Sequence, residues 1–409
     1  MLQKHTRREF LQRASCAPMT SLWLRHFGAG DTPQRVSRWI EAYDRQGIHR
    51  TGTVGDSHSA GWLAGEARKF GVQPALESFA LNRVDPLDCF VELAAKRIEG
   101  VPLFDSAFTD AAGVRGKLGG FGSEAEIGLI ELPPNAEYGP DYETMRRNRK
   151  HKALIIITKG ATPGLSLING AYFQHPFGIP ALQVSSEHGE WLKQQAQQSA
   201  STRLIAQAKR TKTKAYNVTA TIHGTHPKLA PLVVMTPRSG WWHSTSERGG
   251  GLVCWLEVMR TLMANKPVRT ALFVASSGHE LGHLGLDSFI ARRPELILHA
   301  HVWIHFGANI GAIGALNRLQ ALDDELETIA ADAMTKAEIT INDKARRGLA
   351  PFGEAGNIHR GGGRYISLLC PGNPVFHHSA DRWPAAVDAA SVARYAAAFA
   401  DVALRLTSA

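Results

Sequence analysis

Residues 279–283 read His-Glu-Leu-Gly-His, a spacing that zinc proteases use to bind their metal. On a helix, His279 and His283 would lie one turn apart on the same face, with Glu280 beside them. The two imidazoles could then bind Zn²⁺ while the carboxylate served as a general base. This segment alone is sufficient to suggest a metalloenzyme.

The residues around this segment argue against the helix that such a zinc site requires. A buried strand is expected to end near Ala275, and Gly278 stands directly before His279. Gly282 and Gly285 would interrupt the helix, each at a cost of about 1 kcal/mol relative to alanine. We therefore expect His279 to lie in a turn between a strand and a helix.

The elements that must position these residues alternate between short apolar strands and amphipathic helices. Strands expected at 232–235, 270–275 and 301–305 are apolar throughout, which predicts an α/β fold with a mostly parallel sheet covered by helices. Residues 97–210 are rich in glycine, proline and short β-type runs, which predicts a β-rich insertion. We also expect helices at 35–45, 58–69, 187–199, 251–263, 320–335 and 385–406, and strands at 74–81, 218–223 and 337–341.

The N-terminus resembles an export signal. Residues 6–12 read Thr-Arg-Arg-Glu-Phe-Leu-Gln, which is similar to a twin-arginine motif, and the apolar stretch at 14–24 is too short to span a membrane. A basic amphipathic first helix is the alternative. We predict a signal segment at 1–30 and a periplasmic or secreted protein. The rest divides into 31–96 and 211–409, which form the main α/β domain, and the insertion at 97–210.

The bulk composition excludes several classes of partner. The net charge is +9, but the densest basic run, at 146–152, has no interleaved aromatic residues, so we expect no nucleic-acid partner. The four cysteines have neither close pairs nor metal-ligand spacing, and no disulfide framework is expected. No segment reaches the roughly 20 apolar residues of a transmembrane helix.

Four segments resemble motifs of the zinc aminopeptidase and glutamate carboxypeptidase family that carries a protease-associated insertion. The strand at 232–235 ends where that family has a His-x-Asp, and Arg-Gly-Gly-Gly at 248–251 is similar to the turn after its metal-bridging Asp. Residues 272–285 resemble the family's strand followed by Gly-Glu-Glu-Leu-Gly, and 376–382 resemble the segment with its last His ligand. The resemblance covers nearly all of 32–409 and implies the same fold.

The resemblance implies two zinc ions held by five side chains, and this chain changes most of them. The family's His-x-Asp corresponds to Thr-Pro-Arg at 236–238, so a guanidinium, that of Arg238, stands there. The bridging Asp corresponds to Glu247, which keeps the charge. The family's base Glu corresponds to His279, and the ligand Glu beside it corresponds to Glu280, which keeps the residue type.

The last two ligand positions fall on histidines. The family's later Asp corresponds to His305, and its last His corresponds to His377. Arg238 and Arg248 bring two guanidinium groups close to the carboxylates that remain, and these groups stay protonated at any working pH. They would repel a second Zn²⁺ and pair with the carboxylates, so a two-metal site is not expected.

Two arrangements of the site remain open. In the first, His279 is the catalytic base and accepts a proton from water on a single zinc ion. In the second, no metal is present, Arg238 and Arg248 neutralise the carboxylates, and the arginines and histidines carry the chemistry. The single ion would be held by the residues at positions where the family holds metal: Glu247, Glu280 and His377, with His305 as an optional fourth ligand.

Further residues are candidates for substrate binding or support. His243 lies in the loop between the altered motifs, and His359 and Tyr365 lie in a glycine-rich segment where the family places substrate-facing residues. A structural role is the alternative for each. Asp381, four residues after His377, could orient a histidine.

Together these features predict an exported hydrolase that acts on a peptide or small amide with at most one metal ion. The alternatives are a non-catalytic relative that binds a peptide or another small ligand, and metal-free chemistry by the arginine and histidine cluster.

Overall fold

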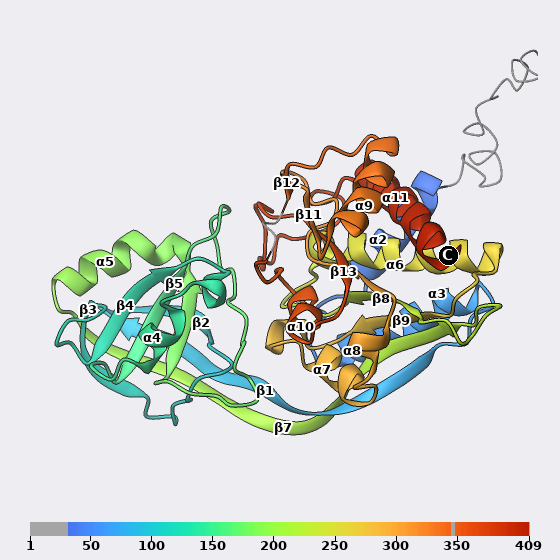
Figure 1. Ribbon diagram of the computed structural model, residues 1–409. Coiled ribbons are helices and arrows are strands. Elements are labelled where there is room, and N and C mark those ends of the chain that lie inside the picture. The colour runs from blue at the N-terminus through green and yellow to red at the C-terminus, as the bar shows by residue number, and fades with distance from the viewer. Residues whose placement is uncertain (1–31, 345–347, 409) are drawn as a thin grey trace, which may run out of the picture.

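A computed structural model describes residues 32–344 and 348–408. The predicted signal segment at 1–30 lies outside these residues. Two lobes share one sheet and are joined by a ribbon of two long antiparallel strands, β1 (Ala75–Leu93) and β7 (Ser201–Ile222) (Figure 1). The whole sheet has the order β1-β2-β6-β5-β4-β3-β7-β9-β8-β10-β13-β11-β12.

The large lobe contains the parallel part of the sheet, which confirms the predicted fold class. Strands β9, β8, β10 and β13 run parallel to one another, while β7 and β11 pair antiparallel at the two sides. β12 extends the sheet beyond β11. The strands span Leu232–Pro237 (β8), Ala271–Ser276 (β9), Val302–Phe306 (β10), Arg318–Ala321 (β11), Asp343–Lys344 (β12) and Tyr365–Leu369 (β13).

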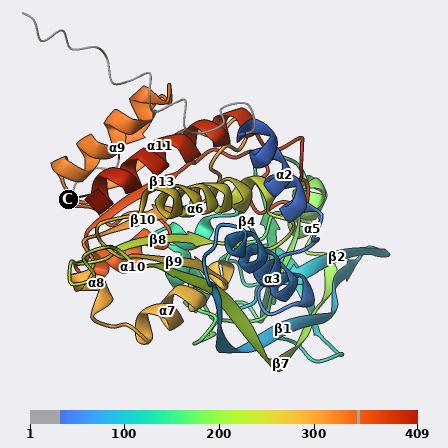
Figure 2. The same cartoon turned by 90° about the vertical axis from the view of Figure 1, so that its right-hand side faces the viewer.

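Helices cover both faces of this sheet (Figures 1 and 2). Alternate residues of one strand point to opposite faces, so Val234 packs with the helices of one layer and Val233 with those of the other. Both layers are apolar, which is why the strands are apolar throughout. One layer holds α2 (Thr32–Asp44), α3 (Val54–Arg68), α6 (Thr245–Asn265), α9 (Asp324–Lys336) and α11 (Ala389–Ser408), and the other holds α7 (Leu284–Ala291), α8 (Leu296–His299) and α10 (Ala355–Arg360).

The small lobe is the predicted β-rich insertion, and it has apolar clusters of its own. Its five strands follow the order β2-β6-β5-β4-β3. The expected boundaries at 97 and 210 fall inside β2 and β7, so the lobe continues into the ribbon. Its elements are β2 (Lys96–Pro102), β3 (Val114–Gly120), β4 (Ile127–Leu132), η1 (Ala136–Tyr138), α4 (Tyr142–Arg147), β5 (Ala153–Thr158), β6 (Ala181–Ser185), η2 (Ser186–His188) and α5 (Gly189–Gln197).

The ribbon was only partly predicted. β1 and β7 pair from Ala75 with Thr219 to Leu93 with Thr202, whereas the expected strands at 74–81 and 218–223 cover only the end of the ribbon in the large lobe. The missed part includes Lys-Arg-Thr-Lys-Thr-Lys at 209–214, which is polar and largely exposed, and also Leu204, Ile205 and Ala206, which are buried. Charged side chains at such strand edges oppose pairing with other chains.

A second difference lies after α9. The expected strand at 337–341 is a turn and an irregular segment, in which Glu338 adopts a left-handed φ of 57°. The expected helix at 320–335 begins later, because β11 includes residues 320 and 321 and Asp323 caps α9 by accepting from the amide of Leu326 at 2.9 Å.

Three cysteines of the described chain, Cys89, Cys254 and Cys370, are free and buried. Within residues 32–344 and 348–408, no helix is long and apolar enough to cross a membrane.

Asp44, at the end of α2, joins three segments of the large lobe. Its carboxylate accepts hydrogen bonds from Thr245 Oγ1 (2.5 Å), from the guanidinium of Arg382 (2.9 Å) and from the amide of Trp383 (3.1 Å). Burial alone would raise the pKa of Asp44, but the hydrogen bonds, that of Arg382 first, outweigh it and leave the pKa below its ordinary value.

We expect Asp44→Asn to lower the free energy of unfolding by about 1–2 kcal/mol at pH 7. A lowered folded-state pKa stabilises the protein above the unfolded pKa of about 3.9, and this stabilisation is lost as the pH falls through the folded value. The difference between wild type and variant in urea denaturation should therefore shrink below about pH 4. An equal difference at pH 3 and pH 7 would contradict the role given to the carboxylate.

Candidate active site

The predicted site residues gather at the carboxyl ends of the parallel strands, which is where open α/β sheets bind ligands. Arg238 follows β8, and His279 follows β9. His305 is the penultimate residue of β10. Glu247 lies in the first turn of α6, and His377 lies in the segment after β13. The sheet therefore brings together residues that are far apart along the chain.

At the centre is a buried carboxylate between a guanidinium and an imidazole. Glu247 Oε1 lies 2.5 Å from Nη2 of Arg248 and 3.3 Å from Nε2 of His377, and all three side chains are buried. Burial alone would raise the pKa of Glu247, but Arg248 and then His377 outweigh it and lower the pKa to about 2. Burial would lower the pKa of His377, but Glu247 raises it above its ordinary value. Arg248, Glu247 and His377 form an array in which the carboxylate lies between a guanidinium and an imidazole.

His279 lies at the edge of this array as a neutral imidazole. Burial, followed by the charge of Arg248, holds the pKa of His279 well below its ordinary value. Its ring stacks on that of His283 with centroids 4.8 Å apart, and its Nδ1 lies 3.6 Å from Oε1 of Glu354. A neutral imidazole with a carboxylate nearby can accept a proton and have the resulting charge balanced.

Sequence analysis missed Glu354. It is fully buried at the start of α10, where Oε1 accepts a hydrogen bond from Ser276 Oγ at 2.7 Å. The neighbouring Gly353 lies against His305, since an added Cβ would stand 3.2 Å from Cε1 of that imidazole. An isolated glutamate in a glycine-rich loop carries no motif, so only the fold reveals it.

Many polar atoms of these buried side chains have no hydrogen-bond partner. Buried polar groups in folded proteins are nearly always paired, so a concentration of unpaired ones needs an explanation. The set contains acceptors and donors, which suits a ligand with both carbonyl and N–H groups. Apart from the atoms that face each other within the array, its members are Oε2 of Glu247, Nη1 of Arg248, Nδ1 of His279, Nε2 of His305 and Oε2 of Glu354.

Backbone strain is concentrated in the same region. Left-handed φ angles occur at Ser244 (51°), His283 (66°), Asn309 (69°) and His377 (57°), four of the nine such non-glycine residues in the described chain. Each costs on the order of 1 kcal/mol, and such residues cluster where function requires them. Asn309 belongs to the site because its amide donates to the carbonyl oxygen of Glu247 at 2.9 Å.

The His-Glu-Leu-Gly-His segment is not helical throughout, as expected from its glycines. His279–Leu281 form a 3-10 turn (η3), and His283 precedes α7 with a left-handed φ. His283 Nδ1 lies 2.9 Å from Oδ1 of Asn357, so one ring nitrogen already has a partner.

Glu280, a predicted metal ligand, is engaged elsewhere. Its Oε1 accepts from the amide (2.8 Å) and hydroxyl (2.7 Å) of Thr51, and its Oε2 accepts from Ser239 Oγ at 2.7 Å. Burial raises the pKa of Glu280. Its carboxylate joins the start of the large lobe to the end of β8.

Arg238, predicted to be catalytic, is bound by residues outside the array. Its guanidinium lies 2.8 Å from Oδ1 of Asp56, donates to the carbonyl of Asp56 at 2.8 Å and also donates to that of Tyr216. Both partners of the ion pair are fully buried. The structure therefore places Arg238 in a buried ion pair with Asp56. Arg248 is the guanidinium that belongs to the array.

The predicted substrate-binding residues are not part of the array. His243 is half-buried, and its carbonyl accepts from Nδ1 of His49 at 2.8 Å. Tyr365 lies in the apolar cluster beneath α7, α8 and α10, and His359 packs edge-on against it with centroids 5.9 Å apart. Asp381 orients α6 instead of a histidine, since it accepts from the amides of Ser246 (2.6 Å) and Glu247 (3.1 Å).

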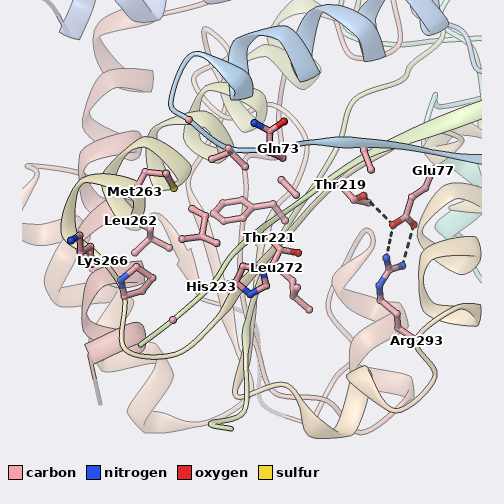
Figure 3. A pocket seen from close by; sticks show the side chains of 18 of the residues that line it. Gln73, Glu77, Thr219, Thr221, His223, Leu262, Met263, Lys266, Leu272 and Arg293 are labelled. Carbon is pink, nitrogen blue, oxygen red and sulfur yellow. Dashed lines mark hydrogen bonds and ion pairs between the residues drawn. The ribbon is translucent and has the colours of Figure 1, made fainter. Parts of the chain in front are cut away.

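A groove of about 720 Å³ lies at the opposite end of α6 (Figure 3). It is lined by Leu262 and Met263 near the end of that helix, while Glu247 is in the first turn, roughly 22 Å away at 1.5 Å per residue. At its edge Glu77 accepts hydrogen bonds from Arg293 and Thr219. None of the array's residues line it.

No protein-family model and no curated protein sequence matches the chain. Solved structures match over nearly its whole length. A peptidase M28 precursor from Shewanella amazonensis has a TM-score of 0.74 at 15% identity, covering 93% of this chain and 96% of that one. A zinc aminopeptidase from Bacillus subtilis has a TM-score of 0.73 at 16% identity, covering 93% and 95%. An aminopeptidase from Aneurinibacillus has 0.69 at 14%, covering 92% and 93%. The chain has the fold of a zinc aminopeptidase. The resemblance inferred from the motifs is thus confirmed at the level of the fold.

The residues of this aminopeptidase-like chain do not fit the zinc ion that its fold suggests. Glu247 is already paired with Arg248, and Glu280 is held by hydroxyl groups. His377 donates from Nδ1 to the carbonyl of Leu167, and its Nε2 already faces Oε1 of Glu247 at 3.3 Å. Among the described residues, no group of three His, Cys, Asp or Glu side chains is placed to hold a metal ion.

The buried pair of Glu247 and Arg248 should show strong energetic coupling. Arg248→Met leaves the carboxylate with only His377, and we expect it to reduce the free energy of unfolding by about 3–5 kcal/mol. The double variant Glu247→Gln/Arg248→Met should lose at least about 1.5 kcal/mol less than the sum of the single variants. Chemical denaturation of the four proteins measures this.

The control is the exposed pair of Glu143 and Arg147 on α4, whose coupling should not exceed about 0.5 kcal/mol. Additive effects at Glu247 and Arg248 would show that the two groups do not neutralise each other.

Proposed function

We propose that this chain is an exported hydrolase of peptide or amide bonds whose active centre is the array of Glu247, Arg248 and His377 with His279 as the base. The observation that carries the proposal is the concentration of unpaired, buried donors and acceptors at the carboxyl ends of the parallel strands. A peptide group presents one carbonyl and one N–H and can pair with both kinds of atom. The fold shared with aminopeptidases supports the same substrate class.

The chemistry follows from the charges of the array. His279, neutral at pH 7, takes a proton from water as the water oxygen attacks the carbonyl carbon of the scissile bond. Arg248 stabilises the negative charge that develops on the carbonyl oxygen, because Nη1 has no hydrogen-bond partner and the site is buried. His279 then returns its proton to the leaving amine as the C–N bond breaks. The water is thereby divided between the two products.

Glu247 and Glu354 serve this reaction as counter-charges. Glu247 holds Arg248 and His377 together despite their like charges. Glu354 Oε1 lies near Nδ1 of His279 and balances its charge while it carries the proton. No step of this proposed mechanism uses a metal ion.

We expect the full chain to hydrolyse aminoacyl anilides or short peptides, and His279→Ala to reduce kcat by about 100-fold or more. His226→Ala, at an exposed histidine in the loop after β7, is the matched control and should leave the rate unchanged. Equal rates for His279→Ala and wild type would rule out His279 as the base.

The metal-free mechanism has its own test. Protein purified without chelators should contain far less than one zinc ion per chain, and its activity should persist in 1,10-phenanthroline. One zinc ion per chain together with loss of activity in the chelator would instead support a mononuclear zinc enzyme. Peptide binding without hydrolysis would support the non-catalytic alternative.

A further inference from the structure

A loop of the small lobe reaches across to the active centre of the large lobe. His377 Nδ1 donates to the carbonyl oxygen of Leu167 at 2.7 Å, and the amide of Leu167 donates back to the carbonyl of His377 at 3.2 Å. Both partners lie in the interior of the protein. Because a carbonyl oxygen can only accept, Nδ1 of His377 must carry a proton, and Nε2 is the nitrogen that faces Glu247.

The residues just before Leu167 extend this contact. Ser166 forms an isolated β-bridge with His378. Gly164 lies so close to His378 that an added Cβ would stand 2.1 Å from its Nε2, and Gly164 itself has a φ of +134°. His378 is held in turn, since its Nδ1 accepts from the amide of Ala380 at 3.0 Å. The loop therefore fits the histidine turn only with a glycine at 164.

The residues just after Leu167 contact the turn that carries His279. The amide of Gly170 donates to the carbonyl oxygen of Glu280 at 2.8 Å. The carbonyl of Ala171 lies against Gly282, where an added Cβ would stand 2.7 Å from that oxygen. The same loop thus spans the two turns of the large lobe that carry His377 and His279.

Between these contacts, the side chain of Asn169 forms two hydrogen bonds. Its Oδ1 accepts from Nε1 of Trp241 at 3.0 Å, and its Nδ2 donates to Glu137 of the small lobe at 2.8 Å. The next residue, Trp242, donates from Nε1 to the carbonyl of His377 at 2.9 Å. Asn169 therefore joins the small lobe to the tryptophan loop that also holds His377.

We infer that the small lobe is a working part of the active centre, in which the loop Gly164–Gly170 positions the His377 imidazole. Nδ1 of His377 donates its hydrogen bond to the loop, so Nε2 is the ring nitrogen that can pair with Glu247. Without the loop the ring could rotate about its χ angles, and Glu247 would lose one of its two partners. The inference rests on the proposed function for its effect on catalysis, but the ring's orientation can be observed without any activity.

The test compares Gly164→Ala with Gly122→Ala in the full chain. Both glycines lie in the small lobe and have positive φ, but an added Cβ at Gly122 meets no atom within 4 Å. Gly122→Ala therefore introduces the backbone strain of a positive φ without a steric clash. NMR of ¹⁵N-histidine-labelled protein reports whether Nδ1–H of His377 is hydrogen-bonded, with His377→Gln to assign the signal.

We expect the His377 Nδ1–H signal in wild type and Gly122→Ala, and its loss or strong broadening in Gly164→Ala. With an active protein, kcat of Gly164→Ala should fall at least about tenfold while KM changes less, because the ring acts on the reaction and not on affinity. Identical signals and rates in the two variants would overturn the inference. If no substrate is hydrolysed but the NMR difference is present, the proposed function fails and the positioning role stands.

Asn169→Ala provides an independent variant that adds neither strain nor bulk. It removes the bridge between Trp241 and Glu137, and if Gly164→Ala does not fold, it takes over the test. We expect it to weaken the His377 Nδ1–H signal. An unchanged signal in folded Asn169→Ala, together with a rate equal to that of wild type, would count against the loop as a positioning element.

Discussion

The contact on which the site depends is the one between Glu247 and Arg248. A buried carboxylate is unstable alone, and a buried guanidinium is equally so, since each loses its hydration. Placed 2.5 Å apart in the first turn of α6, they neutralise each other, and Nε2 of His377 faces the same carboxylate at 3.3 Å. The surrounding network of Asp381, Asn309 and the α6 amides keeps the pair in place.

This arrangement also explains why the described residues form no metal-binding group on the fold of a zinc aminopeptidase. A metal ion would supply positive charge at the carboxyl ends of the strands. The guanidinium of Arg248 supplies positive charge at the same end of the sheet, and it is part of the chain itself. Once Arg248 contacts Glu247, a cation bound there would be repelled by the guanidinium. Glu280 follows the same logic, because hydroxyl donors from Thr51 and Ser239 satisfy it.

Some of this was predictable from the sequence, and some was not. The apolar strands β8 and β10 must be buried on both faces, and the motifs located Glu247, His279 and His377. Contacts between distant segments escaped, such as Thr51 with Glu280, because hydroxyl-bearing residues carry no spacing pattern. The missed half of the ribbon includes the polar run at 209–214, where a buried strand would have apolar residues. Glu354 lies in a loop that has no recognisable motif, and Leu167 contributes a backbone carbonyl. Only their three-dimensional contacts reveal these roles.

The ribbon of β1 and β7 has a consequence for how the chain folds. Its strands are joined by the whole small lobe, so their pairing brings together segments such as Ala75 and Thr219 that are far apart in sequence. Closing so long a loop is entropically unfavourable unless the intervening chain has already collapsed. The small lobe, with its own apolar clusters, can form first and hold the ends of both strands in register. The site would then be completed last, when β7 joins β9 and the loop at Leu167 meets His377.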